Sequence, residues 1–582
     1  MRRRYVWAGW FVTALLVVGP ASAGDGVTVL DFLGTTAPEQ ASDICLLNAN
    51  AADTTNAENV WPGGGAGLAL TGAGVTVGLW DGGSVRPTHQ ELIGRISVLD
   101  GAANSDHSTH VAGTIGATGV LAAARGMASQ VALRSRDYFN DLAEMTADAG
   151  LIDLSNHSYG YLRGWTSRIT WSVGQADTWV CDRSLYTEDV WFGKYEGAQN
   201  YVDAALGFDI ARPRDLDTLL HANKHLLAVW SAGNDRTDAF LDVRGDGSYV
   251  TYLSGGPEGA GWYLVTGGVP GPDGDYDCLS QSQVAKNTLT VGSVLDHTLD
   301  PHDPLSITPS SFSSYGPTDD GRIKPDVVAN GQSLYSCTSA ADNHYGLFSG
   351  TSMAAPNVTG SAALLVEHYR NLHGRSPASA TTKGLILHTA TDVGNTGPDY
   401  SSGWGLMNTA AAADFLSDDA QGSPSDWLVD DVALAGGTLV LDVYLDGSEA
   451  LKATLCWTDP APDLLPGGGL DDPTPVLVND MDLTVVGPDE TTYYPWTLDP
   501  DNPTSPAVRS ALNHVDNVEQ VVIDAADIAP GWYEIVISNT GTLTGEQDIS
   551  LLVSGVVPEP LTVSLLAIAG LAVLRRRRRR VR

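Results

Sequence analysis

The chain has 582 residues, of which 69 are acidic and 32 are basic, and its formal net charge is −37. So large an acidic excess is a poor match for a phosphate backbone, which needs a surplus of Lys and Arg, so nucleic-acid binding is excluded as the main function. The length is too great for one compact core and predicts at least two domains.

The first 23 residues have the order of a secretory signal. Three arginines precede an apolar run from about Val6 to Val18, and Ala21 and Ala23 form an A-x-A cleavage pattern. We therefore expect residues 1–23 to be a cleaved signal peptide; an uncleaved membrane anchor is the alternative, but the apolar run is short for one. Residues 24–56 are interpreted as an N-terminal segment ahead of the first domain.

Residues 74–415 alternate short apolar strands with helical stretches, and we assign residues 57–415 to this domain. This alternation predicts an α/β domain on a parallel, helix-covered sheet. Two stretches rich in Trp, Gly and Asp, 161–200 and 236–280, are interpreted as long surface insertions. Strands are expected at 75–80, 151–156, 226–231 and 288–294, and helices at 352–373 and 380–390.

The pattern changes after a polar stretch, residues 416–427, which we interpret as a linker. Beyond it, short strands separated by Gly, Pro, Asp and Asn turns predict an all-β sandwich or jelly roll over residues 428–556. Its strands are expected at 438–444, 451–457, 482–486, 519–523, 532–538 and 549–554.

Residues 557–582 combine Pro558-Glu559-Pro560, a run without charge from Leu561 to Leu574, and an arginine cluster. As a helix, this run would be about 21 Å long, shorter than the roughly 30 Å hydrocarbon core of a bilayer. The order resembles the PEP-CTERM sorting signal of certain Gram-negative bacteria, with a lone weak membrane anchor as the alternative. Without the ten arginines of the two ends, the rest of the chain would carry −47 instead of −37.

Three residue types that act together in nucleophilic catalysis occur at strand and helix ends. Asp81 follows a strand, His107 lies where a helix begins, and Ser352 opens a long helix. The carboxyl ends of parallel strands share one edge, where functional groups collect. A serine hydroxyl becomes a nucleophile when a histidine takes its proton and a carboxylate orients that histidine. Asn234, past another strand end, can donate to the resulting oxyanion together with the Ser352 backbone N–H.

Each of these patterns has another interpretation when taken alone. His107 and His110 have the spacing of a metal pair, but H-E-x-x-H is absent and no third ligand is evident. His110 is better interpreted as a packed histidine. An esterase and a surface binding protein with an inactive protease fold are the alternative functions. Ser352 does not lie in the Gly-x-Ser-x-Gly pattern of many esterases.

With Gly350-Thr351-Ser352-Met353-Ala354-Ala355-Pro356 as the most specific motif, residues 74–412 resemble the subtilisin family of serine peptidases, the subtilases. The resemblance implies Asp81, His107 and Ser352 as the triad of a serine endopeptidase that forms an acyl-enzyme on Ser352. It also implies Asn234 as the oxyanion donor. The substrate-binding residues that it implies are Ser158, Tyr159, Gly160, Ser231, Ala232 and Gly233.

Three segments of the second domain, 455–460, 478–483 and 517–520, resemble the C-terminal β-barrel of the KP-43-like subtilases. The chemistry needs no cofactor. Structural Ca²⁺ is expected from the resemblance and from acidic loops at Asp471-Asp472 and Asn479-Asp480, with solvated loops as the alternative.

The export signals also define the expected partners and compartment. We expect protein or peptide substrates, a signal peptidase and an exosortase-type enzyme as partners of a monomer. The chain would be exported, transiently anchored in the membrane by its C-terminal segment, and then placed at the cell surface or outside the cell. Disulfides can form there, so Cys181 and Cys278 are candidates for a pair, with buried free thiols as the alternative.

Overall fold

The computed structural model describes residues 48–160, 164–169, 188–192, 212–237, 248–256, 259–266, 275–296, 303–304, 306–463, 473–557 and 579–581. The predicted signal peptide, the apolar run Leu561–Leu574, Asp471-Asp472 and Cys181 lie outside these residues. None of the helices found in the described ranges is long and apolar enough to span a membrane.

The first domain contains the predicted parallel α/β sheet. All neighbouring pairs among its seven strands are parallel, and the strand order is β11-β10-β7-β4-β1-β3-β2. The central strands are buried along their whole length, as expected of a sheet covered on both faces. The strands are β1 (Thr76–Asp81), β2 (Ile96–Val98), β3 (Ala132–Asp137), β4 (Leu154–His157), β7 (Leu227–Ser231), β10 (Leu289–Val294) and β11 (Val327–Asn330).

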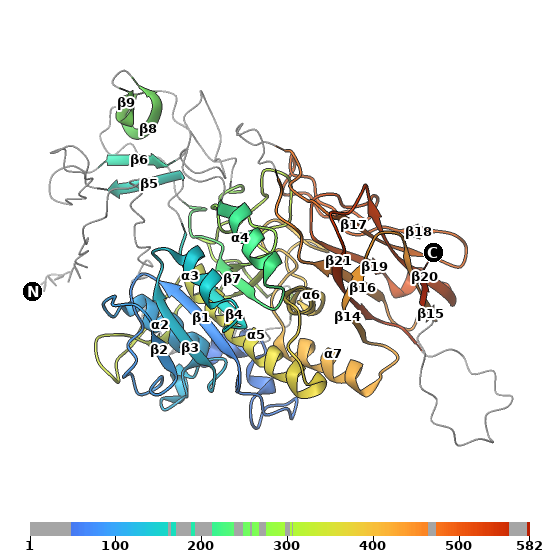
Figure 1. Ribbon diagram of the computed structural model, residues 1–582, viewed down its shortest axis with the longest axis horizontal. Coiled ribbons are helices and arrows are strands. Elements are labelled where there is room, and N and C mark those ends of the chain that lie inside the picture. The colour runs from blue at the N-terminus through green and yellow to red at the C-terminus, as the bar shows by residue number, and fades with distance from the viewer. Residues whose placement is uncertain are drawn as a thin grey trace, which may run out of the picture.

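Helices cover this sheet, and the longest of them, α5, packs against β4, β7, β10 and β11 (Figure 1). Gly374 ends α5 in the left-handed conformation, with a φ of 70° that suits glycine. Strands β12 (Leu334–Cys337) and β13 (Tyr345–Phe348) form a hairpin beside α2. The helices are α1 (Asn48–Thr54), α2 (Asp106–Gly116), α3 (Asp141–Asp148), α4 (Arg212–Ala222), α5 (Thr351–His373), α6 (Ser379–Thr389) and α7 (Thr409–Gln421), with short 3-10 helices η1 (Glu58–Val60), η2 (Ala122–Ala124) and η3 (Ala525–Asp527).

Two boundaries differ from the sequence prediction. Residues 48–56 are not a separate segment, because Ala51 and Ala52 of α1 are fully buried in the core of the first domain. The predicted linker is helical as far as Gln421, since α7 continues into it. Asn408 caps that helix by accepting a hydrogen bond from the Ala411 N–H, and its apolar face is buried, which outweighs the polar composition of its last turns.

The two predicted insertions contain strands of their own. These strands form a four-stranded sheet of order β5-β6-β8-β9, which lies apart from the body of the domain (Figure 1). The strands are β5 (Gly164–Ile169), β6 (Glu188–Phe192), β8 (Ser248–Gly256) and β9 (Gly259–Thr266).

The second domain consists of two antiparallel sheets that enclose one apolar core, which confirms the predicted sandwich. One sheet has the order β14-β21-β16-β19 and the other has the order β18-β17-β20-β15-β22. The strands are β14 (Trp427–Leu434), β15 (Leu439–Leu445), β16 (Leu451–Trp457), β17 (Asp480–Val486), β18 (Thr492–Tyr493), β19 (Val518–Ile523), β20 (Gly531–Thr540), β21 (Gln547–Ser554) and β22 (Arg579–Val581).

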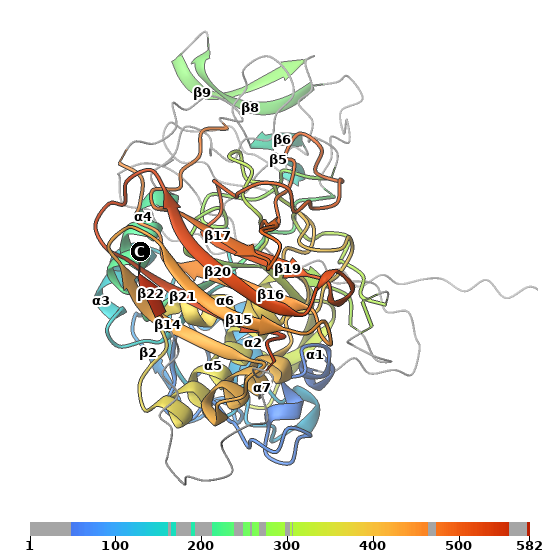
Figure 2. The same ribbon diagram turned by 90° about the vertical axis from the view of Figure 1, so that its right-hand side faces the viewer.

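The two domains share a buried seam. Helix α6 of the first domain packs against β16 and β21 of the second (Figure 2). The approach is close at Gly384, where an added Cβ would lie 2.9 Å from Leu552 Cδ1 and 3.1 Å from Cys456 Cβ. Leu552 and Cys456 belong to the same buried cluster as the core of the first domain. The core of the first domain thus extends across the seam onto one face of the second domain, which also encloses its own core.

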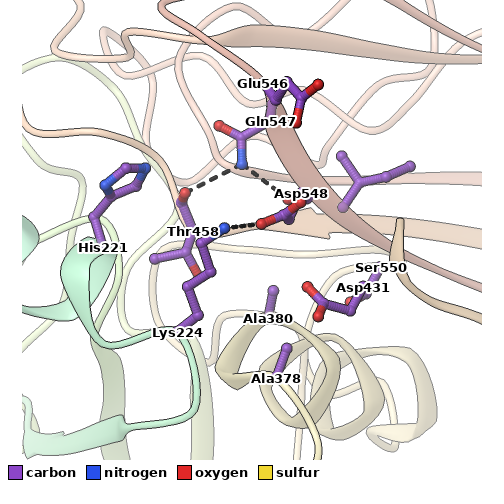
Figure 3. A pocket seen from close by; sticks show the side chains of 11 residues that line it. His221, Lys224, Ala378, Ala380, Asp431, Thr458, Glu546, Gln547, Asp548 and Ser550 are labelled. Atoms are coloured by element: carbon purple, nitrogen blue, oxygen red, sulfur yellow. Dashed lines mark hydrogen bonds and ion pairs between the residues drawn. The ribbon is translucent and has the colours of Figure 1, made fainter. Parts of the chain in front are cut away.

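Charged side chains also cross this seam. Lys286, which is fully buried ahead of β10, donates to Asp459 Oδ2 at 2.6 Å and to the carbonyl oxygens of Pro460 and Val476 at 2.8 and 2.7 Å. A second pair, Lys224–Asp548, lies at the rim of a small pocket between the domains and is partly exposed (Figure 3).

Candidate active site

The carboxyl edge of the parallel sheet brings three chain segments together. Asp81 is the last residue of β1, and β4 pairs with β1 so that Trp80 lies opposite His157. On the other side of β4, His157 lies opposite Trp230 of β7. Because these strands are parallel, Asp81, Ser158 and Ser231 all emerge at one edge.

Asp81 and His107 form a direct hydrogen bond there. His107 Nδ1 donates to Asp81 Oδ1 over 2.7 Å, and the same oxygen accepts from the Gly82 N–H at 2.7 Å. Asp81 is 1% exposed, while 15% of the His107 side chain is exposed. Since an ionised carboxylate only accepts, Nδ1 carries the proton, and Nε2 of a neutral imidazole is left as an acceptor.

Ser108, the residue after His107, also contacts the carboxylate. Its hydroxyl lies 3.1 Å from Asp81 Oδ1 and donates to the Gly83 carbonyl at 2.8 Å. It therefore adds a polar contact to Asp81 without displacing His107.

Ser352 is in the first turn of α5, against the end of β4. Its Oγ donates to the Ser158 carbonyl oxygen at 3.0 Å, and the Ser158 hydroxyl donates to the Ser352 carbonyl oxygen at 2.9 Å. Asn156, two residues earlier on β4, donates to the Ser158 hydroxyl at 3.0 Å and accepts from the Thr359 hydroxyl, two turns further along α5. This network fixes the start of α5, where the helix dipole is positive, beside the end of β4.

Asn234 lies at the same helix start. Its Oδ1 accepts from the Thr351 N–H at 2.8 Å and from the Thr351 hydroxyl at 3.1 Å. The amide oxygen is thereby occupied, and Nδ2 remains as the donor of this side chain. The Gly233 N–H donates to the Thr351 hydroxyl at 3.1 Å, so residues 231–234 are tied to the helix that carries Ser352.

The sequence did not indicate the network that supports Tyr159. The Tyr159 hydroxyl donates to Asp141, which also forms an ion pair with Arg212. His157 stacks on Trp230 with ring centroids 3.9 Å apart, and Trp230 Nε1 donates to the Tyr159 carbonyl at 2.8 Å. Burial lowers the pKa of His157 to about 3, so this ring is neutral. These contacts fix both the backbone and the side chain of Tyr159, which follows directly on Ser158.

Gly160 completes this segment and lies against polar side chains. A Cβ at this position would lie 2.7 Å from Gln283 Nε2 and 3.3 Å from Ser280 Oγ. Both side chains are buried, and Ser280 donates to Gln283 Oε1 at 2.7 Å. A Cβ at this position would require the end of the Gln283 side chain to shift, and the side chains that face Gly160 are polar.

The structure also shows the setting of His110 and of three cysteines, which are all buried. His110 is fully buried, its Nε2 lies 3.0 Å from the Leu334 carbonyl oxygen, and burial lowers its pKa to about 3. It is a packed histidine, as the sequence favoured. Cys278, Cys337 and Cys456 are buried free thiols in the described part of the chain, and Cys181, the partner predicted for Cys278, lies outside it.

The structure thus contains an imidazole oriented by a carboxylate at the end of β1 and, at the start of α5, a serine hydroxyl close to an asparagine amide. These are the parts that acyl transfer through a serine requires. They come from β1, α2, α5 and the loop after β7.

Known proteins were compared with this chain. An extracellular serine protease of Serratia marcescens is 25% identical over 362 residues, which cover 58% of this chain and 31% of that protein. The serine protease/ABC transporter B family protein tagA of Dictyostelium discoideum is 28% identical over 287 residues, which cover 42% of this chain and 15% of that protein. The chain therefore spans less than a third of either relative.

Among solved structures, a lanthipeptide protease is 17% identical and has a TM-score of 0.39; the match covers 63% of this chain and 93% of that one. The self-cleaved protease domain of PatA is 20% identical with a TM-score of 0.37, covering 60% of this chain and 98% of that one. The profile of the subtilase family matches residues 72–405, more than half of the chain. The chain belongs to the subtilase family of serine peptidases.

Proposed function

We propose that the chain is an exported serine endopeptidase with Asp81, His107 and Ser352 as its triad. The observation that carries this proposal is the hydrogen bond from His107 Nδ1 to Asp81 Oδ1, at the sheet edge against which Ser352 is held. Family membership gives the reaction class, and the geometry supplies a residue for each role.

In the proposed reaction, the Ser352 hydroxyl turns from the Ser158 carbonyl and attacks the scissile carbonyl carbon. His107 Nε2 takes the hydroxyl proton, and Asp81 stays ionised and stabilises the imidazolium. The Ser352 N–H and Asn234 Nδ2 donate to the oxyanion. His107 then protonates the leaving amine as the C–N bond breaks, which leaves an acyl-enzyme on Ser352. Water, deprotonated by His107, hydrolyses this ester and restores the hydroxyl.

The substrate backbone is proposed to pair along Ser158, Tyr159 and Gly160, as an added strand. Residues Ser231, Ala232 and Gly233 would border it on the other side. Support comes from the hydrogen bonds that fix both segments. Trp230 Nε1 donates to the Tyr159 carbonyl oxygen, and the Gly233 N–H donates to the Thr351 hydroxyl.

The export route is also part of the proposal, with a signal peptidase at the N-terminus and an exosortase-type enzyme at the PEP-CTERM-like C-terminus. The sandwich is proposed to be the jelly-roll domain of a KP-43-like monomer. Mass spectrometry of the extracellular protein is expected to find neither residues 1–23 nor Arg582. Recovery of an intact Arg582 outside the cell would refute the sorting proposal.

Active-site labelling tests the catalytic proposal. A fluorophosphonate probe is expected to modify intact wild-type protein at Ser352 and to leave Ser352→Ala unmodified. An unlabelled wild-type chain would refute the proposal and favour an inactive binding protein. Casein and a short-chain ester, compared as substrates, separate the peptidase from an esterase.

A further inference from the structure

The second domain contains a cluster of titratable side chains outside the candidate active site. Asp480 and Asp482 are two residues apart on β17 and so point to the same face of the sheet. His514, in the loop before β19, lies beside them: its Nδ1 is 2.9 Å from Asp480 Oδ2 and 4.0 Å from Asp482 Oδ1. One ligand atom from each of the three residues lies within 4.8 Å of the other two.

As far as the chain is described, the two carboxylates of this cluster are incompletely hydrogen-bonded: Asp480, 19% exposed, bonds His514 Nδ1 through Oδ2 only. Only 5% of the Asp482 side chain is exposed; its Oδ2 accepts from Thr540 at 3.0 Å, but Oδ1, on the side of His514, has no hydrogen-bond partner in the described part of the chain. Asp480 Oδ1 is likewise buried and has no hydrogen-bond partner among the described residues. A buried carboxylate oxygen without a donor is costly unless a cation compensates it.

A third acidic side chain lies close to this cluster. Glu519 of β19 is fully buried; its Oε2 accepts from the Leu483 N–H at 2.6 Å, while Oε1 has no partner among the residues described. Burial and the neighbouring Asp482 and Asp480 raise the pKa of Glu519 well above its usual range. Within the described ranges, His514 is the one basic side chain within ion-pair distance of these acids.

We propose that Asp480, Asp482 and His514 bind one divalent metal ion, with two carboxylate oxygens and one imidazole nitrogen as protein ligands. Ligands about 2.1 Å from a tetrahedral Zn²⁺ are about 3.4 Å apart, and the 2.9 and 4.0 Å separations lie on either side of this value. The imidazole favours Zn²⁺ over Ca²⁺, which prefers oxygen ligands throughout.

The position of the site suits a structural role and an open entry path. Half of the His514 side chain is exposed, so an ion can enter from solvent and water can complete its coordination. The ion would join β17 to the loop that leads into β19, which are strands of opposite sheets of the sandwich. Binding is expected to stabilise the folded chain and has no role in the reaction proposed for Ser352.

The test uses the full chain with Ser352→Ala as background, so that self-cleavage does not obscure melting. After chelation and dialysis, addition of Zn²⁺ is expected to raise Tm by several degrees, and titration calorimetry to show a Zn²⁺ site that the ligand variants remove. Asp482→Asn is expected to abolish both effects, and His514→Gln to weaken Zn²⁺ binding at least tenfold. Asp446→Asn, at an exposed acid of the same domain, is the control that keeps both.

The outcomes separate the parts of the proposal. Equal Zn²⁺ responses in wild type and Asp482→Asn would refute the site. Stabilisation by Ca²⁺ that Asp482→Asn removes but His514→Gln keeps would refute the imidazole ligand. If Asp482→Asn does not fold, His514→Gln still decides, because its side chain is half exposed. Labelling of Ser352 is independent of all these results.

Discussion

The carboxyl edge of the parallel sheet and the seam between the domains both bury charged side chains, but they differ in how fully those side chains are bonded. At the seam, Asp459 accepts on both oxygens: Oδ1 from the Asn479 N–H, and Oδ2 from the Val478 N–H and Lys286. At the sheet edge, Asp81 uses Oδ1 alone for His107, and Oδ2 has no hydrogen-bond partner among the described residues.

This difference distinguishes the seam, where ion pairs attach the domains to each other, from the sheet edge, where side chains are available for a reaction. A fully bonded buried ion pair holds two elements in one arrangement, whereas a group with unused bonding capacity can interact with a ligand or a reacting atom. The cluster at Asp480 and Asp482 resembles the sheet edge in this respect. Substitutions at the edge are expected to change catalysis, and those at the seam to change stability.

The largest effect is expected from Asp81→Asn. An asparagine can no longer stabilise the imidazolium or fix the Nδ1–H tautomer of His107, so kcat at neutral pH is expected to fall by about 10⁴. Tm is expected to stay within a few degrees of wild type. Asp137→Asn is the matched control, because Asp137 pairs with Asp81 across β1 and β3 at the same edge. A comparable loss of kcat in the control would remove the distinction between the two carboxylates.

Lys286→Met tests the other side of the comparison. It leaves Asp459 as a buried charge without its cation, so the free energy of unfolding is expected to fall by about 3–5 kcal/mol. Denaturant titration of the Ser352→Ala background measures this change. The residual activity of folded Lys286→Met, made with Ser352 intact, is expected to match wild type.

The seam offers its own control in Lys224→Met. Lys224 pairs with Asp548 (Figure 3). About half of the Lys224 side chain is exposed, so we expect a loss below about 1 kcal/mol. If both lysine variants lose the same stability, burial does not distinguish the two ion pairs, and the account of the seam is wrong.

The sequence could predict the sheet and the placement of Asp81 and Ser352. The carboxyl ends of parallel strands lie at one edge of the sheet, so a residue that follows a strand is expected at that edge. A strand followed by a carboxylate, or a serine at the start of a helix, is a local pattern that is enough to predict where that residue lies. The boundaries were less accurate: α7 extends into the predicted linker because Asn408 and a buried apolar face support the helix.

The sequence could not reveal pairs formed by distant residues. Asp141 and Arg212 are 71 residues apart and come from different helices, and Lys286 and Asp459 are 173 residues apart. Nothing near either partner signals the other. Segments 455–460, 478–483 and 517–520 were noticed as motifs, but only the structure shows that they meet Lys286 at the seam or form the cluster at Asp482.

The seam is also expected to show a change in pH dependence. His388 of α6 is buried, with Nδ1 2.8 Å from the Thr454 hydroxyl and Nε2 2.8 Å from the Ser554 hydroxyl. Burial, with a contribution from Lys452, lowers its pKa well below 6.5. Below pH 6.5 the unfolded chain therefore takes up a proton that the folded chain does not, so this histidine's contribution to stability is present above pH 6.5 and is lost as the pH falls.

One such group changes the free energy of unfolding by about 1.4 kcal/mol per pH unit, or about 2 kcal/mol between pH 6.5 and pH 5. His388→Gln removes this titration, so the destabilisation that it causes is expected to be about 2 kcal/mol smaller at pH 5 than at pH 7. Subtracting wild type from variant cancels the other titrating groups. Lys452→Met is the control, since it removes the neighbouring charge and keeps the imidazole. A difference between variant and wild type that does not change with pH would show that His388 is not the group that makes the seam sensitive to acid.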